Sequence, residues 1–127
     1  MVEVVAAVIE RADGAFLLAQ RPAGKVYAGW WEFPGGKVDE GETTDAALSR
    51  ELHEELGIEV QRAYAWITRV FVYPHATVRL NFFRVLQWAG EPHSKEDQAI
   101  RWQRFDQPMA EPMLPANAPV LLSLIHI

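Results

Sequence analysis

The sequence predicts an α+β fold, in which helices pack on a mixed β-sheet. Two long segments rich in β-branched and aromatic residues, 60–73 and 77–88, predict a pair of strands separated by Pro74-His75. Apolar residues recur at helical spacing over 47–56 and predict an amphipathic helix. Because the chain contains no repeat, no low-complexity tract and no linker, we expect residues 1–127 to form a single domain.

The N-terminal region predicts a hairpin. Two apolar runs, 4–9 and 15–21, flank Ala12-Asp13-Gly14, and Asp-Gly between such runs is typical of a tight turn. We therefore expect these two strands to pair with each other. A further short strand over 30–33 is predicted to end at Pro34-Gly35-Gly36, because proline and glycine interrupt strands.

The predicted helix has recognisable ends. Thr43 or Thr44 can cap its N-terminus, and Asp45 suits the positive end of the helix dipole. Gly57, which follows Leu56, is typical of a residue that ends a helix in the left-handed conformation.

The last third of the chain predicts two more elements. A polar loop over 89–98 leads into a strand over 99–105. Residues 108–119 are proline-rich and predict irregular structure. The apolar residues 120–127 predict a helix that closes against the sheet.

Composition excludes several classes of function. Half of the residues are hydrophobic and 23% are charged, which is typical of a globular protein. There is no cysteine, so a disulfide framework, a thiolate metal site and a cysteine nucleophile are excluded. With no visible signal segment and no apolar run near the roughly 20 residues of a membrane span, we expect a cytoplasmic protein without membrane contact. The net charge of −5 and the lack of a basic stripe disfavour stable nucleic-acid binding.

Carboxylates crowd the segment from Asp39 to Glu55. Glu51, Glu54 and Glu55 stand at i, i+3 and i+4, so they project from one face of the predicted helix. Few cations compensate them, although Arg50 can reach Glu54 or the preceding loop. A solvated acidic face would explain such a pattern. Carboxylates beside a glycine-rich turn are also suitable ligands for Mg²⁺ or Mn²⁺, which completes its coordination with water and substrate phosphates.

These residues also carry a resemblance to a known family. Every fixed position of the Nudix box is present at its spacing, namely Gly36, Glu42, Arg50-Glu51-Leu52, Glu54-Glu55 and Gly57-Ile58. The chain therefore resembles the Nudix hydrolases. This resemblance implies an α/β/α sandwich and a hydrolase for nucleoside diphosphates linked to another moiety.

The resemblance implies a role for each residue of the box. The implied metal ligands are Glu51, Glu54, Glu55 and a carbonyl of Gly35 or Gly36, the implied catalytic residues are Glu51, Glu54 and Arg50, and the implied structural residues are Glu42 and Gly57. The implied cofactor is Mg²⁺ or Mn²⁺. Glu51 or Glu54 would take a proton from the attacking water, and Arg50 would hold a glutamate in place.

Outside the box, the chain is similar to the MutT-type 8-oxo-dGTP diphosphatases over nearly its full length. The similarity lies in the segments EFPGGK, WAGEP, KEDQ and LPANAPV. It implies that Arg21 contacts phosphate and that Glu96 adds to the metal site. One departure is Ala76, where such proteins commonly carry a basic residue, and Arg79 is the nearest candidate to replace it.

Asn117 and Phe33 are candidate base-binding residues. Oxidation at C8 turns guanine N7 into a donor beside the O6 acceptor, and one side-chain amide can meet both groups. Asn117 could therefore select 8-oxoguanine, although the same amide turned over could read adenine, and an N-cap of the last helix is an equally good interpretation. Phe33 could stack on a base, but a core position at a strand end is at least as good an interpretation.

Several functions remain open at this point. The favoured one is metal-dependent hydrolysis of 8-oxo-dGTP to the monophosphate and pyrophosphate by a monomer that sanitises the nucleotide pool. The alternatives within the same family are a dinucleoside polyphosphate, a nucleotide sugar or a modified pyrimidine triphosphate as substrate. A non-catalytic nucleotide-binding module is less favoured, because such modules are expected to lose box glutamates that this chain keeps.

Overall fold

The structure, a computed structural model, describes residues 1–125. Its elements in chain order are β1 (Val2–Ile9), β2 (Phe16–Gln20), β3 (Trp31–Glu32), β4 (Gly35–Lys37), α1 (Thr44–Leu56), β5 (Glu59–Val72), β6 (Thr77–Ala89), β7 (Ile100–Gln103) and α2 (Ala118–Ile125). The predicted central helix and the predicted pair of long strands are confirmed. No helix within the described residues is long and apolar enough to cross a membrane.

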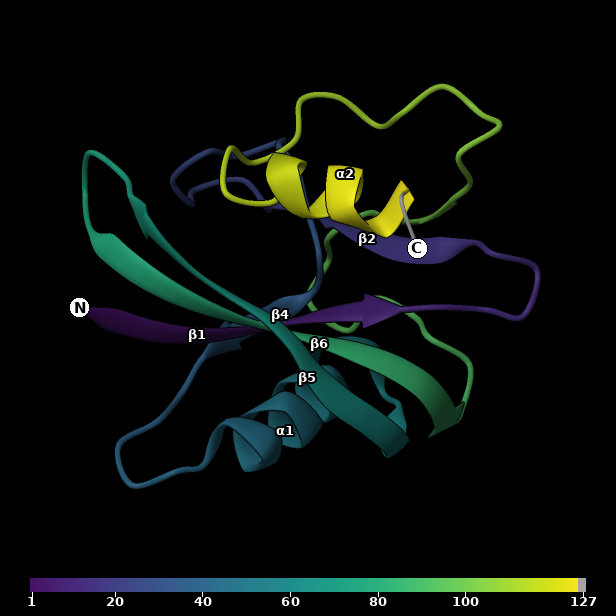
Figure 1. Cartoon of the computed structure of the whole chain (residues 1–127), viewed down its shortest axis with the longest axis horizontal. Coiled ribbons are helices and arrows are strands. Elements are labelled where there is room, and N and C mark those ends of the chain that lie inside the picture. Colours follow the sequence, from purple (N-terminus) through teal and green to yellow (C-terminus); the bar gives the residue numbers. More distant parts are fainter. Residues whose placement is uncertain (126–127) are drawn as a thin grey trace.

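The strands form two sheets. The larger has the order β4-β1-β6-β5, in which β1 runs parallel to β6 and antiparallel to β4 (Figure 1). The smaller is antiparallel and has the order β3-β2-β7. The predicted mixed sheet is thus confirmed, but it is accompanied by a second sheet that the sequence did not indicate.

The predicted N-terminal hairpin is wrong as a strand pairing. The turn forms, since the Gly14 N–H donates to Arg11 O at 3.0 Å, but only the bridge between Glu10 and Phe16 continues it. Beyond that bridge the two strands enter different sheets, because β1 is already paired with β4 and β6 on its two edges. A local turn signal cannot show that the edges of a strand are taken by distant partners.

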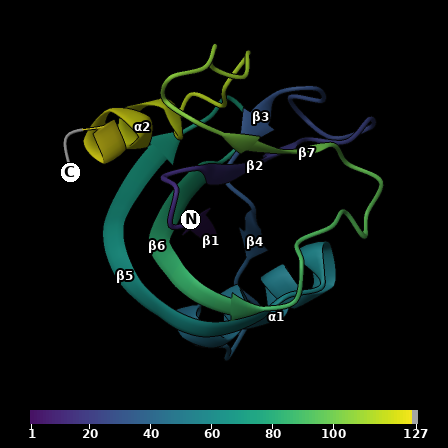
Figure 2. The same cartoon turned by 90° about the vertical axis from the view of Figure 1, so that its right-hand side faces the viewer.

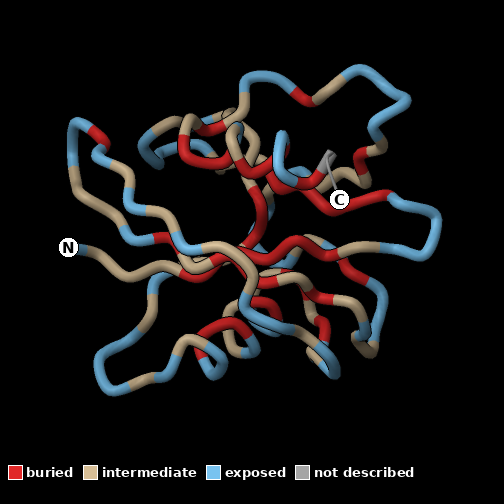
Figure 3. The backbone as a smooth tube through the Cα atoms, in the orientation of Figure 1, coloured by how far each residue is buried: buried red, intermediate tan, exposed pale blue. Residues whose placement is uncertain are grey.

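The two helices cover opposite sides of the sheets, which confirms the α/β/α sandwich (Figures 1 and 2). Alternate residues of β1 explain this arrangement, because they point to opposite faces. Val5, Ala7 and Ile9 belong to the core packed against α1, whereas Ala6 and Val8 belong to the core packed against α2. Residues 5–9 of β1 are buried without interruption, and they form one continuous buried stretch in Figure 3.

β3 ends before Pro34, as predicted, but the expectation that Gly35 and Gly36 form a turn is wrong, because they belong to a separate strand. Residues Gly35–Lys37 form β4 and pair with β1. A Cβ on Gly35 would lie 1.9 Å from the Val5 carbonyl oxygen, so only glycine allows this close approach of two backbones. Glycine has a low strand propensity, and the sequence therefore gives no sign of β4.

The helix ends agree with their signals. Thr43 is the N-cap, and its hydroxyl accepts a hydrogen bond from Ala46 N at 3.1 Å. Gly57 has φ of 68°, the left-handed conformation expected at the helix end. The second helix begins at Ala118, two residues before the predicted start, and the last two residues of its predicted range, 126 and 127, lie outside the described part.

Candidate active site

Arg50 joins the predicted acidic residues into one network. Its Nε and Nη2 donate to Glu42 at 2.8 and 2.9 Å, while its Nη1 donates to Glu51 at 3.0 Å and to Glu54 at 3.2 Å. Nη2 also donates to the carbonyl of Lys37 at 3.0 Å. The expectation that Arg50 reaches Glu54 and the preceding loop is therefore confirmed, and the same guanidinium also pairs with Glu51.

Glu42 braces the loop before α1 against the helix. Its carboxylate accepts the two bonds from Arg50 and one from the Asp39 N–H at 3.0 Å. The hydrogen bonds from Arg50 lower the pKa of Glu42 to about 2. The carboxylate is therefore ionised at neutral pH, and it holds the loop at the start of the helix that carries the other glutamates.

Glu51 and Glu55 meet the glycine strand β4. A Cβ on Gly36 would lie 2.4 Å from the Glu51 carboxylate, so the absence of a side chain makes room for that carboxylate. The Gly35 N–H donates to Glu55 Oε2 at 3.2 Å. The carboxylates of α1 thus face the glycine backbone of β4.

Glu96 approaches the same site from the loop between β6 and β7. That loop is attached to the end of α1, where the N–H groups of His93 and Lys95 donate to Leu56 O at 3.1 Å and Glu55 O at 2.9 Å. Gly57 contributes to this attachment, because a Cβ there would lie 2.5 Å from the His93 ring. The role of Gly57 therefore extends beyond ending the helix, and no local pattern indicates the contact with His93.

The carboxylates raise one another's pKa values. Burial and repulsion from Glu51, Glu32 and Glu96 raise the pKa of Glu55 to about 9, against a lowering by the Gly35 N–H. Burial also raises the pKa of Glu51, although the bond from Arg50 lowers it. Like charges held this close in a partly buried site are unfavourable unless a cation balances them.

The donor set fits a hard divalent cation in its chemistry. Carboxylate oxygens and backbone carbonyls are the ligands that Mg²⁺ and Mn²⁺ prefer, and the crowded negative charge requires a positive partner. Within residues 1–125, however, no three acidic or histidine side chains converge at the spacing of a metal shell. Arg50 instead occupies one oxygen each of Glu51 and Glu54.

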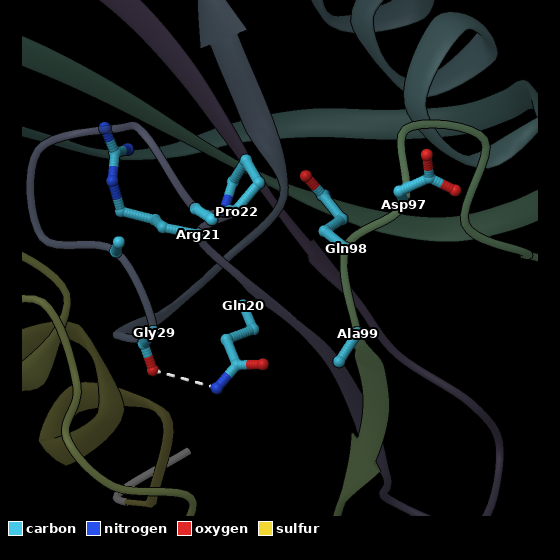
Figure 4. Close-up of a pocket in the computed structure, with 9 residues that line it drawn as sticks. Gln20, Arg21, Pro22, Gly29, Asp97, Gln98 and Ala99 are labelled. Atoms are coloured by element: carbon cyan, nitrogen blue, oxygen red, sulfur yellow. Dashed lines mark hydrogen bonds between the residues drawn. The ribbon is translucent and has the colours of Figure 1, made fainter.

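Arg21 lies at a pocket beside this acidic site. The pocket, about 370 Å³ in volume, is formed by the segment after β2 and the segment before β7, and Gln20, Arg21, Asp97 and Gln98 supply its polar side chains (Figure 4). Arg21 is held in place, since its Nε donates to Val26 O at 2.6 Å and its Nη1 lies 3.3 Å from a Glu32 oxygen. Sequence reasoning missed Glu32, although an acidic residue between Trp31 and Phe33 was a possible signal.

Asn117 and Phe33 are linked, but not as expected. The Asn117 Oδ1 accepts a hydrogen bond from the Phe33 N–H at 2.9 Å. This side-chain bond connects the residue after β3 to the start of α2 and is not a cap of that helix. The Phe33 side chain is 2% exposed and packs between Phe16 and Phe82. Phe33 is therefore a core residue, and the suggestion that its ring stacks on a base is wrong for this structure.

Arg79, the nearest candidate to replace the basic residue expected at Ala76, is engaged in an ion pair. Its Nη1 donates to Glu3 at 2.6 Å. Arg79 is next to Leu80 in β6, and Leu80 belongs to the core on the α2 side, so Arg79 points to the other face of the sheet.

The sandwich, the carboxylate face of α1 and the facing glycine strand define a class of protein. A profile of the NUDIX domain matches residues 5–123. The chain belongs to the Nudix family and is a hydrolase of its MutT type.

Relatives and solved structures show the same similarity over nearly the whole chain. The chain is 42% identical to the CTP pyrophosphohydrolase of Escherichia coli K12, covering 95% of this chain and 89% of the relative. It is 38% identical to the 8-oxo-dGTP diphosphatase of Haemophilus influenzae, covering 99% and 93%. The crystal structure of the MutT NUDIX hydrolase from Burkholderia pseudomallei is 31% identical and superposes with a TM-score of 0.86, covering 95% of each chain.

Proposed function

We propose that this chain is a metal-dependent pyrophosphohydrolase that converts a nucleoside triphosphate, with 8-oxo-dGTP as preferred substrate, to the monophosphate and pyrophosphate. One observation carries the proposal, namely that Glu51 and Glu55 face Gly36 and Gly35 across the gap between α1 and β4. A polyphosphate substrate brings negative charge to this already negative site. It can therefore bind only together with cations.

The residues that would hold Mg²⁺ or Mn²⁺ are Glu51, Glu54, Glu55, Glu96 and a carbonyl of Gly35 or Gly36. When bound, the metal would neutralise charge on the phosphates and lower the pKa of the attacking water. Glu51 or Glu54 would accept the proton of that water. Arg50, which already bonds both carboxylates, would hold them in position.

Arg21 and Asn117 would bind the two ends of the nucleotide. The bond between the Phe33 N–H and Asn117 Oδ1 fixes the plane of the amide. The second lone pair of Oδ1 can accept from N7–H of 8-oxoguanine while the amide nitrogen donates to O6. In ordinary guanine N7 is an acceptor, so that first contact is lost and the base binds less well.

A pyrimidine triphosphate is the second candidate substrate. The relative at 42% identity, named a CTP pyrophosphohydrolase, favours it. The amide of Asn117 does not exclude it, because an amide oxygen can accept from the exocyclic amine of cytosine. The two candidates share the same hydrolytic site and differ only in the base contact.

The proposed reaction is tested by following products and metal dependence together. Monophosphate and pyrophosphate are measured for 8-oxo-dGTP, dGTP, CTP, a dinucleoside polyphosphate and a nucleotide sugar, in Mg²⁺, in Mn²⁺ and in EDTA. We expect a triphosphate to yield monophosphate and pyrophosphate only when metal is present. Equal activity in EDTA, or tight metal-free binding of a triphosphate by calorimetry, would contradict the proposal.

A further inference from the structure

We propose that Glu32 is a positioning residue that sets the orientation of Arg21 toward the substrate phosphates. This inference rests on the proposed function, in which Arg21 contacts phosphate. Glu32 and Arg21 lie on paired segments, since β3 pairs with β2 through Gln20 and Trp31. Because the pairing is antiparallel, Glu32 lies opposite Ala19, and Arg21 lies two residues beyond Ala19 on the same face of the small sheet. Arg21 and Glu32 are thus diagonal neighbours, and their side chains meet.

The contact fixes a guanidinium that is partly open to solvent. The Arg21 Nη1 lies 3.3 and 3.4 Å from the two Glu32 oxygens, and both side chains are 27% exposed. The Arg21 Nε is bound on its other side to the Val26 carbonyl. These contacts use at most three of the five guanidinium N–H groups, so at least two remain to meet a phosphate oxygen.

The position of Glu32 is unfavourable for a carboxylate that only contributes to stability. Burial raises its pKa, and the positive charge of Arg21 is what opposes this effect. Glu32 also repels Glu55, whose carboxylate belongs to the proposed metal site. The Glu32 carboxylate places a further negative charge near a site that must admit phosphates. This placement is explained if Arg21, the cation paired with Glu32, itself belongs to the phosphate-binding site.

The backbone next to Glu32 supports a function in positioning. The following residue, Phe33, donates its N–H to Asn117, and Gly35 donates its N–H to Glu55. One short extended segment therefore touches the proposed phosphate residue, base residue and metal site in turn. These bonds fix the segment that carries Glu32. Glu32 therefore holds Arg21 at a constant position relative to Asn117 and to the proposed metal site.

The inference is tested by a double-mutant cycle on the triphosphate that the wild-type protein hydrolyses best. Glu32→Gln keeps the volume of the side chain and removes its charge. We expect Glu32→Gln and Arg21→Ala each to raise KM, with a loss of kcat/KM of roughly 10- to 100-fold. The double variant should be no worse than Arg21→Ala, since Glu32 acts through Arg21. Glu32→Asp keeps the charge and should lose less than Glu32→Gln.

The chain provides a matched control in a second partly buried ion pair, Arg84 and Glu10. Its atoms approach to 2.5 Å, and its side chains are 14% and 18% exposed, so it is less exposed than the Arg21–Glu32 pair. Glu10→Gln should lower the melting temperature at least as much as Glu32→Gln and leave KM unchanged. This control separates the loss of an ion pair from the loss of phosphate binding.

Three outcomes would overturn the inference while leaving the proposed function intact. They are additive losses in the cycle, an unchanged KM in a folded Glu32→Gln variant, and a weaker Mn²⁺ affinity with an unchanged nucleotide KM. A weaker Mn²⁺ affinity with an unchanged KM would mean that Glu32 acts on metal binding and not on Arg21. If the wild-type protein hydrolyses no nucleotide of the panel, the proposed function fails, and the inference fails with it.

Discussion

The Gly36 backbone and the Glu51 carboxylate are so close that a Cβ on Gly36 would lie 2.4 Å from the carboxylate. Side chains cannot approach a methyl group this closely, so Glu51 owes its position to the glycine as much as to its own helix. This contact joins β4 to α1, the helix that carries the box glutamates. It also shows why a residue without a side chain belongs in the site.

We predict that Gly36→Ala removes activity with a modest effect on stability. The added methyl group must displace the Glu51 carboxylate, and a displacement of about 1 Å can cost roughly 100-fold in rate. Gly14→Ala is the control, because Gly14 has φ of 89° and open space around it, so alanine there costs about 1–2 kcal/mol of stability and no activity. Measurements of kcat and of urea unfolding decide the matter, and a Gly36→Ala enzyme with wild-type kcat would contradict the prediction.

We predict that Glu54→Gln leaves the protein folded and lowers kcat by more than about 100-fold at saturating Mg²⁺, because the amide is a poor metal ligand. Relief of repulsion should not raise the melting temperature noticeably. Glu54 is 54% exposed and pairs with Arg50, so the change in unfolding free energy should stay within about 0.5 kcal/mol. Glu59→Gln, which changes the same charge at an exposed position outside the box, should keep full activity. Retention of wild-type kcat by Glu54→Gln would remove it from the metal site.

The ion pair of Glu42 with Arg50 predicts a pH-dependent contribution to stability. The pKa of Glu42 is about 2 in the folded protein against an ordinary value of 4.5. A lowered folded pKa means that the contribution is complete above about pH 4.5 and is lost as the pH falls toward 2. The difference in melting temperature between wild type and Glu42→Gln should therefore be constant from pH 7 to 5 and should shrink below that range. A difference that stays the same at pH 3 would show that the pair is not formed as described.

Asn117 should contribute separately to stability and to base selection. Asn117→Ala leaves the buried Phe33 N–H without its acceptor, which should cost about 1–3 kcal/mol. It should also reduce the preference for 8-oxo-dGTP over dGTP by about 1–3 kcal/mol, or roughly 5- to 150-fold. Asn117→Asp keeps an oxygen for the Phe33 N–H but loses the amide donor and places a carboxylate at a position that is 2% exposed, so it should recover at most part of the stability and none of the selectivity. If Asn117→Ala lowers stability and leaves selectivity unchanged, Asn117 serves only to tie β3 to α2.

Local patterns predicted the elements that local physics determines. The apolar spacing of α1 and the β-branched runs of β5 and β6 are properties of contiguous residues, and all three elements were found from sequence. The partners of β1 were not, because its edges are occupied by strands far along the chain, and neither was β4, because a strand of two glycines and a lysine depends on close contact with Val5. The single-domain prediction for residues 1–127 stays a prediction.

The candidate site likewise contains residues that local sequence indicated and contacts that only the tertiary structure shows. The box spacing identified the carboxylates and Arg50, because all of them except Glu96 lie on or next to one helix. The engagement of Arg50 with Glu42, the attachment of the Glu96 loop through His93, and the pairing of Glu32 with Arg21 depend on tertiary contacts. Burial of the Phe33 ring depends on three segments that meet, so sequence alone could not decide between core and base stacking.

The most direct test of the proposed function is the ratio of kcat/KM for 8-oxo-dGTP to that for dGTP, measured with the wild-type protein in Mg²⁺ and with CTP in the same series. We predict that 8-oxo-dGTP is hydrolysed most efficiently, by at least roughly 5-fold over dGTP, because N7–H adds one contact at Asn117. A ratio near one for the two purines, or a higher kcat/KM for CTP than for 8-oxo-dGTP, would contradict it.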